Sequence, residues 1–318
     1  MSRLQRKSLT VVALGGNAII QRGEHGTFEE QYRNVQSTMA QMADLIAQGH
    51  QVIITHGNGP QIGATLIRHE MGGQTVPSLP LHACGAETQG FLGYMIQQTL
   101  QAELAKRGAS RAVATVITQV LVDRNDPAFQ NPTKPIGPFY TEWQKRRILE
   151  ERDDIAIKED SGRGYRRVVP SPDPTLVVES ATIQTLVENG VIVIACGGGG
   201  IPVVQSDGSL SGTEAVIDKD LAAERLATSV GASRLAIMTD VDGVFLNYGR
   251  DDQRFLAKVR RDDLAKYAEL GHFAAGSMGP KVEAVLRFLD HGGDRAVIGY
   301  LGSLKETVEG RAGTQITA

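Results

Sequence analysis

Two lysines, each at the start of an expected helix, are the residues of this chain best placed to bind phosphate. Lys219 lies between Asp218 and Asp220, ahead of apolar residues at helical spacing, and Lys281 follows Pro280, a residue favoured in a first helical turn. A lysine in a first turn opposes the helix dipole at a cost of roughly 0.3–1 kcal/mol, unless an anion shares the site. Either lysine alone could be an ordinary exposed side chain, but two in the same placement favour a phosphate site.

Glycine-rich turns follow four apolar segments of the chain. Apolar runs without alternation are typical of strands buried on both faces of a parallel sheet, and ligands bind such sheets beyond the carboxyl ends of the strands. Glycine lets the backbone approach a ligand and turn its amides toward an anion. The turns therefore indicate a phosphorylated ligand, and they follow the segments 9–14, 51–55, 191–196 and 235–238.

Familiar catalytic motifs are absent from the sequence. It contains no GxxxxGK[ST], GxSxG, HExxH or CxxC. Residues 57–63 read GxGxxxG, but Pro77 and Ser78 stand where a dinucleotide-binding site needs an acid, which disfavours a dehydrogenase. His56, at a strand end, is more typical of a structural histidine than of a general base. Asp220 is either a simple first-turn acid or a residue that orients the neighbouring lysines.

Expected strands and helices alternate along the 318 residues, which predicts an α/β fold with a parallel sheet. A polar, proline-punctuated insertion at 123–172 interrupts the alternation and predicts either a small flap or a surface excursion. Residues 197–212 are expected to form a loop. The expected helices lie near 32–45, from 60, and at 81–106, 179–188, 219–230 and 280–290, and further strands at 112–122 and, as the last, 295–300.

Composition narrows the class of protein. A net charge of −3 gives no global attraction to nucleic acid. Two distant cysteines, Cys84 and Cys196, exclude a disulfide framework and suit a reducing cytosol. We expect no signal peptide, because residues 1–8 are polar, and no membrane span, because no apolar run reaches about 18 residues. The predicted location is cytoplasmic.

Eight segments of the chain form a distinctive set: VVALGGNAI (11–19), THGNGPQIG (55–63), NPTKPIGPF (131–139), KEDSGRGYRRVVPSP (158–172), CGGGGIPVV (196–204), EAVIDKDLA (214–222), TDVDGVFLNYG (239–249) and HFAAGSMGPKVEA (272–284). This set resembles the carbamate kinases, a branch of the amino-acid kinase superfamily, and the resemblance extends over nearly the whole chain. The flap motifs NPTKPIGPF and KEDSGRGYRRVVPSP are the most particular to that branch.

The resemblance implies a three-layer αβα sandwich around a mainly parallel sheet of about eight strands, with a small protruding subdomain. It implies an N-terminal lobe, 1–205, that holds carbamate and includes the flap 123–172, and a C-terminal lobe, 206–318, that holds the nucleotide. The implied reaction is ATP plus carbamate to ADP plus carbamoyl phosphate, with Mg²⁺, in a homodimer. Fermentative cells usually run this reaction toward ATP, with arginine metabolism as one source of carbamoyl phosphate. No protein side chain is assigned to the metal, and no nucleic-acid or membrane partner is implied.

The resemblance also implies roles for individual residues. Lys134 on the flap would reach carbamate or the transferring group, Lys219 and Lys281 would contact nucleotide phosphates, and Asp220 would position lysines. The remaining residues fall into a group around carbamate and the phosphoryl group, Gly15, Gly16, Asn17, Gly57, Asn58 and Gly59, and a group around adenosine, Asp240, Asp242, Gly243, Val244, Tyr248 and Met278. Gly279 and the stretch 84–87 differ from the commonest family pattern.

Two other functions stay open at this stage. One is a kinase of another small acid, such as acetylglutamate, although the flap motifs favour carbamate. The other is a nucleotide sensor without catalysis, which the presence of all three lysines disfavours.

Overall fold

The main sheet of the protein has eight strands, and one pair of neighbours is antiparallel. The computed structural model describes residues 8–318 except 22, 74, 152–154, 161, 163 and 275. From edge to edge the strands are β15 (Lys258–Arg260), β17 (Thr314–Thr317), β16 (Arg295–Tyr300), β12 (Arg234–Thr239), β1 (Leu9–Leu14), β2 (Gln51–His56), β9 (Ile192–Ile194) and β3 (Val113–Thr115). Only β16 and β17 run antiparallel in the described sheet.

Helices cover both faces of this sheet. The α-helices of the body are α1 (Phe28–Ala47), α2 (Gly59–Gly72), α3 (Leu81–Lys106), α5 (Ser180–Glu188), α6 (Lys219–Ser229), α7 (Arg261–Glu269), α8 (Met278–Asp290) and α9 (Leu304–Val308). Alternate residues of β1 enter different cores: Val11 and Ala13 pack with α5, α6 and α8, whereas Val12 and Leu14 pack with α1, α3 and α9. This alternation confirms the predicted αβα sandwich. Short 3₁₀ turns are η1 (Gly16–Ala18), η2 (Pro127–Phe129), η3 (Gly197–Gly199) and η4 (Leu301–Ser303).

The strand expected at 112–122 is instead two strands in different sheets. β3 ends at Thr115, and β4 (Gln119–Val122) belongs to a second sheet with the strand order β11 (Ser209–Gly212), β10 (Ile201–Ser206), β4 and β8 (Pro174–Val177). The Gln89 side chain holds the break, because it accepts a hydrogen bond from Thr118 N (2.8 Å) and donates one to Thr118 O (3.1 Å). Periodicity could not show this break, since residues on both sides of it are apolar.

Two further expectations about strands were wrong. The expected loop at 197–212 contains the hairpin of β10 (Ile201–Ser206) and β11 (Ser209–Gly212), which completes the second sheet beside β4 and β8 (Pro174–Val177). The last strand is β17 rather than β16. The predicted lobe boundary at 205–206 falls inside β10, and the division into lobes stays a prediction. A small hairpin joins β13 (Phe245–Leu246) and β14 (Arg254–Phe255).

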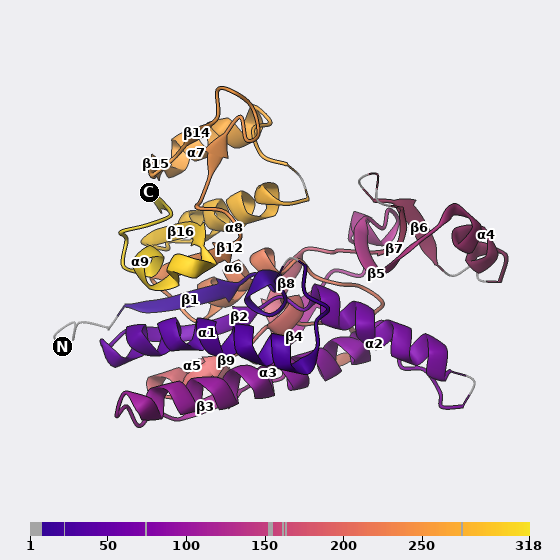
Figure 1. Cartoon of the computed structure of the whole chain (residues 1–318), viewed down its shortest axis with the longest axis horizontal. Helices are drawn as coiled ribbons and strands as arrows, with labels where there is room; N and C mark the ends of the chain where they lie inside the picture. Colours follow the sequence, from indigo (N-terminus) through magenta and orange to yellow (C-terminus); the bar gives the residue numbers. More distant parts are fainter. Residues whose placement is uncertain are drawn as a thin grey trace.

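The insertion forms a projecting unit of its own, which Figure 1 shows standing out to the right of the body. It contains a three-stranded antiparallel sheet, β5 (Lys134–Tyr140), β7 (Tyr165–Val169) and β6 (Ala156–Glu159), and helix α4 (Glu142–Glu151). Its base packs on the body through a small apolar cluster of Ile136 and Val169 with Ile62, Leu66, Leu81 and Cys84. The cluster fixes β5, and therefore the flap lysine at its start, over the N-terminal end of α2.

Among the described residues, the helices are all too short or too polar to cross a bilayer.

Candidate active site

The turns after β1 and β2 lie against each other at the carboxyl edge of the main sheet. Gly57 N donates a hydrogen bond to Leu14 O (3.0 Å), which joins the two turns. A Cβ added to Gly57 would lie 3.5 Å from Gly16 N and 3.3 Å from Lys219 Cδ. Glycine therefore brings two backbone turns and a lysine stem to one point, as a site for a small anion requires.

A single buried carboxylate holds the two predicted lysines together. Asp220, at the start of α6, is 2% exposed. One of its oxygens pairs with Lys219 Nζ, and the other lies 3.1 Å from Nζ of Lys281, near the start of α8. Lys281 Nζ also donates to the backbone oxygen of Ser277 (3.3 Å). The two lysines thus lie on either side of the Asp220 carboxylate, and a role for Asp220 in orienting them stays a prediction.

The flap contributes the third lysine from a distant part of the chain. Lys134 Nζ lies 2.6 Å from Asp218 Oδ2, and Asp218 caps α6 by accepting from Asp220 N (2.9 Å). Burial alone would raise the pKa of the Asp218 carboxyl, but the ammonium groups of Lys134 and Lys219 outweigh it and hold that pKa below its usual value. Sequence reasoning missed this role of Asp218, although an aspartate directly before a helix is a typical N-cap.

These side chains surround a cavity of about 270 Å³. The described lining does not include Gly15 or Asn17: a Cβ on Gly15 would lie 3.0 Å from Met238 O, and Asn17 is exposed. The predicted residues that do line the cavity are Gly16, Gly57, Asn58, Gly59, Lys134, Lys219, Asp220 and Lys281.

A second cavity, of about 540 Å³, adjoins the first, and Ser277 lines both. Of the residues predicted around adenosine, its described lining includes Asp240, Tyr248 and Met278 but not Asp242, Gly243 and Val244. Val244 is buried and donates its N–H to Thr314 Oγ1 (2.8 Å). Two adjoining cavities suit a ligand with a bulky end and a phosphate end. Nothing in the sequence around Ser277 marks it as the junction.

A wall of glycines closes the first cavity behind Asn58. A Cβ on Gly198 would lie 2.2 Å from Asn58 Nδ2, and one on Gly197 would lie 2.4 Å from His56 Nε2. Asn58 Nδ2 in turn donates to Thr88 Oγ1 (2.8 Å). The glycines therefore leave room for Asn58 to stand between the wall and α3.

His56 is fixed as a neutral, buried residue. Its Nδ1 lies 3.0 Å from Gly57 O, and burial lowers the pKa of the imidazole to about 4. These features agree with the structural role expected for it.

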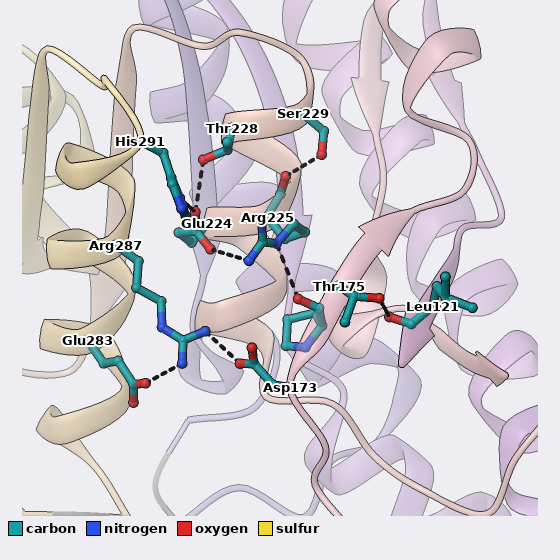
Figure 2. A network of polar contacts seen from close by, with 11 residues as sticks. Leu121, Asp173, Thr175, Glu224, Arg225, Thr228, Ser229, Glu283, Arg287 and His291 are labelled. Atoms are coloured by element: carbon teal, nitrogen blue, oxygen red, sulfur yellow. Dashed lines mark hydrogen bonds and ion pairs between the residues drawn. The ribbon is translucent and has the colours of Figure 1, made fainter. Parts of the chain in front are cut away.

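A polar network braces the two lysine-bearing helices away from the cavity (Figure 2). Glu224 of α6, fully buried, accepts from Thr228 Oγ1 (2.8 Å) and faces His291 Nδ1, just after α8, at 2.9 Å. Arg287 of α8 pairs with Asp173 (2.6 Å), directly before β8. Since α6 and α8 are tied here as well as through Asp220, the lysines are held on a rigid support.

The fold and the site together are those of a class of phosphoryl-transferring enzymes, and comparison with known proteins identifies the family. The model of the amino acid kinase family matches residues 8–300. A carbamate kinase of Pyrococcus furiosus is 55% identical over 308 residues, covering 96% of this chain and 98% of that protein. One from Trichomonas vaginalis is 46% identical over 309 residues, with the same coverage. A solved structure described as carbamate kinase from Giardia lamblia bound to AMP-PNP has a TM-score of 0.92 at 40% identity, covering 98% of this chain and 99% of that one. The chain belongs to the carbamate kinases of the amino acid kinase family.

Proposed function

We propose that the protein transfers a phosphoryl group reversibly between ATP and carbamate, in the cavity around Asp220. The observation that carries this proposal is the convergence of Lys134, Lys219 and Lys281 on one small cavity beside the nucleotide-sized one. Relatives named carbamate kinases, at 46–55% identity over nearly their full length, support the choice of carbamate as acceptor.

Phosphoryl transfer to carbamate mainly requires that the protein position the reactants and neutralise their negative charge. Carbamate is already an oxyanion, so no general base has to activate it, and neutral His56 is not needed as one. The γ-phosphoryl group carries charge spread over its oxygens as it moves in line between donor and acceptor. Lys219 and Lys281 would neutralise charge on the nucleotide phosphates, while Asn58 and the amides of Gly57 and Gly59 would hold carbamate.

The flap lysine would complete the site from above. Lys134 pairs with Asp218, and a phosphoryl group in the cavity would offer it a second anion at the same place. Because the flap packs on α2 through its own apolar cluster, Lys134 can contribute to transfer without forming part of the nucleotide cavity.

Mg²⁺ fits the site as a partner of the nucleotide phosphates. The two carboxylates in the cavity lining, Asp218 and Asp220, are each occupied by lysine ammonium groups, which leaves them poorly suited to bind a metal directly. When bound, Mg²⁺ would supply further neutralisation of phosphate charge.

The test is ATP formation from ADP and carbamoyl phosphate with Mg²⁺, followed with a coupled ATP assay. We expect ATP in proportion to enzyme, and no comparable rate with acetylglutamyl phosphate as donor. Absence of ATP at any practical enzyme concentration would exclude the proposed function and favour a nucleotide sensor.

We further propose a cytoplasmic homodimer that runs toward ATP in fermentative catabolism, for example of arginine. The family resemblance is the support for this, and sedimentation at micromolar concentration checks the dimer.

A further inference from the structure

Three side chains of different chemistry meet between α2 and α3, outside the catalytic cavity. His69 lies in the last turn of α2, and Cys84 and Glu87 lie three residues apart on α3, so that they share one face of that helix. The potential ligand atoms, His69 nitrogen, Cys84 Sγ and a Glu87 oxygen, all lie within 4.8 Å of one another, and His69 Nε2 is 3.3 Å from Glu87 Oε2. No other group of this kind occurs among the described residues.

An ordinary ion pair explains only part of this arrangement. A partly exposed histidine–glutamate pair contributes little to stability, and it has no need of a thiol beside it. Cys84 is fully buried, and its thiol donates a single long hydrogen bond among the described residues, 3.7 Å to Leu79 O.

The surroundings of the sulfur favour a cation. A Glu87 carboxylate oxygen lies within 4.8 Å of the sulfur, and a second carboxylate, that of Glu214, lies at the start of α3 with Arg167 3.9 Å away from it. Glu214 is held nearby because it accepts a hydrogen bond from Leu81 N (2.8 Å). A divalent ion at the sulfur would face two carboxylates and one guanidinium.

An ion could reach the cluster from solvent. His69 and Glu87 line a cavity of about 890 Å³ between the start of α1 and helices α2 and α3. Their side chains are 23% and 48% exposed, whereas Cys84 lies beneath them. The thiol would lose its proton to solvent as the metal–sulfur bond forms.

We propose that His69, Cys84 and Glu87 bind one Zn²⁺, with solvent as the fourth ligand. Nitrogen, sulfur and carboxylate oxygen are the ligands of zinc sites in proteins, and three protein ligands with an open position are typical of accessible ones. Mg²⁺ prefers oxygen ligands alone, so this site is distinct from the Mg²⁺ that accompanies the nucleotide.

Co²⁺ is the probe that tests the sulfur ligand. Metal-free protein without a histidine tag, without nucleotide and with a phosphine reductant is titrated with Co²⁺. We expect the visible bands of tetrahedral Co²⁺ and a near-ultraviolet thiolate-to-cobalt band, both complete at one equivalent and both removed by Zn²⁺. Absence of the thiolate band in the wild-type protein would overturn the proposal.

Variants assign the band to its ligands. Cys84→Ser should abolish the thiolate band, and His69→Gln or Glu87→Gln should weaken Co²⁺ binding at least tenfold. Cys196→Ser, at the other cysteine of the chain, is the matched control and should keep the band. A band that persists in Cys84→Ser would refute the site. If Cys84→Ser does not fold by circular dichroism, His69→Gln decides, because unchanged Co²⁺ affinity in that partly exposed variant would refute the site equally.

Discussion

Replacing Gly198 by alanine would test whether the glycine wall sets the position of Asn58. The new Cβ would lie 2.2 Å from Nδ2, 2.4 Å from Cγ and 2.7 Å from Oδ1 of Asn58, so the whole amide must move. The hydrogen bond from Asn58 to Thr88 would be lost, at a net cost of about 1 kcal/mol. Gly198 has a φ of +67°, a left-handed conformation that costs alanine about 1–2 kcal/mol. We therefore expect Gly198→Ala to lower the free energy of unfolding by about 2–3 kcal/mol.

Gly198→Ala should also reduce turnover strongly, even in protein that remains folded. Displacement of a substrate-holding group by about an ångström can reduce turnover by about 10²-fold. The assay measures turnover with carbamoyl phosphate and the Kd for ADP on folded protein, and ADP binding should be nearly unchanged because Asn58 lies outside the larger cavity. Gly208→Ala is the matched control: its φ is +79° and an added Cβ meets nothing within 4 Å, so it should cost stability alone. Normal turnover in Gly198→Ala, or an equal loss in Gly208→Ala, would refute the reasoning.

Three other predictions concern the lysines and the buried histidine. Lys219→Ala or Lys281→Ala should each reduce turnover by about 10²-fold or more, measured by steady-state kinetics, and near-normal rates in both would contradict the proposed phosphate contacts. Lys134→Ala should reduce transfer by a similar factor while ADP binding, measured by calorimetry, is preserved; loss of ADP binding would mean that the flap has a structural role instead. Because burial lowers the pKa of His56 from 6.5 to about 4, the unfolded state binds the extra proton between these values. The free energy of unfolding should therefore fall by about 1.4 kcal/mol per unit as the pH drops from 6.5 to 4, and His56→Gln should lack this contribution in denaturant titrations at pH 7 and pH 5.

Sequence patterns predicted the parallel α/β sheet and the lysine-bearing helices because these depend on local signals, whereas the three-layer arrangement was implied by the family resemblance. The expected helix 81–106 is α3 itself, and Lys219 is the first residue of α6 as predicted. Helix α8 begins at Met278, two residues before the predicted start at Pro280, so Lys281 is its fourth residue. Asp220 was predicted to orient lysines, and it contacts both.

Contacts between distant segments were beyond sequence reasoning. Lys134 and Asp218 form an ion pair although 84 positions separate them in the sequence, and hydrophobic periodicity cannot predict a contact over that separation. The number of glycines at 197–200 did not reveal their role. Glycine is required there because a Cβ would collide with neighbouring atoms, for example those of Asn58. The break between β3 and β4 at Thr118 depends on hydrogen bonds to the side-chain amide of Gln89, which lies on helix α3.

The decisive measurement is the initial rate of ATP formation from ADP, Mg²⁺ and carbamoyl phosphate, taken side by side for the wild-type protein and for Lys134→Ala, Lys219→Ala and Lys281→Ala. We predict turnover by the wild type and a fall of about 10²-fold in each variant. No ATP from the wild type, or rates near the wild-type value in all three variants, would contradict the assignment of this cavity to phosphoryl transfer.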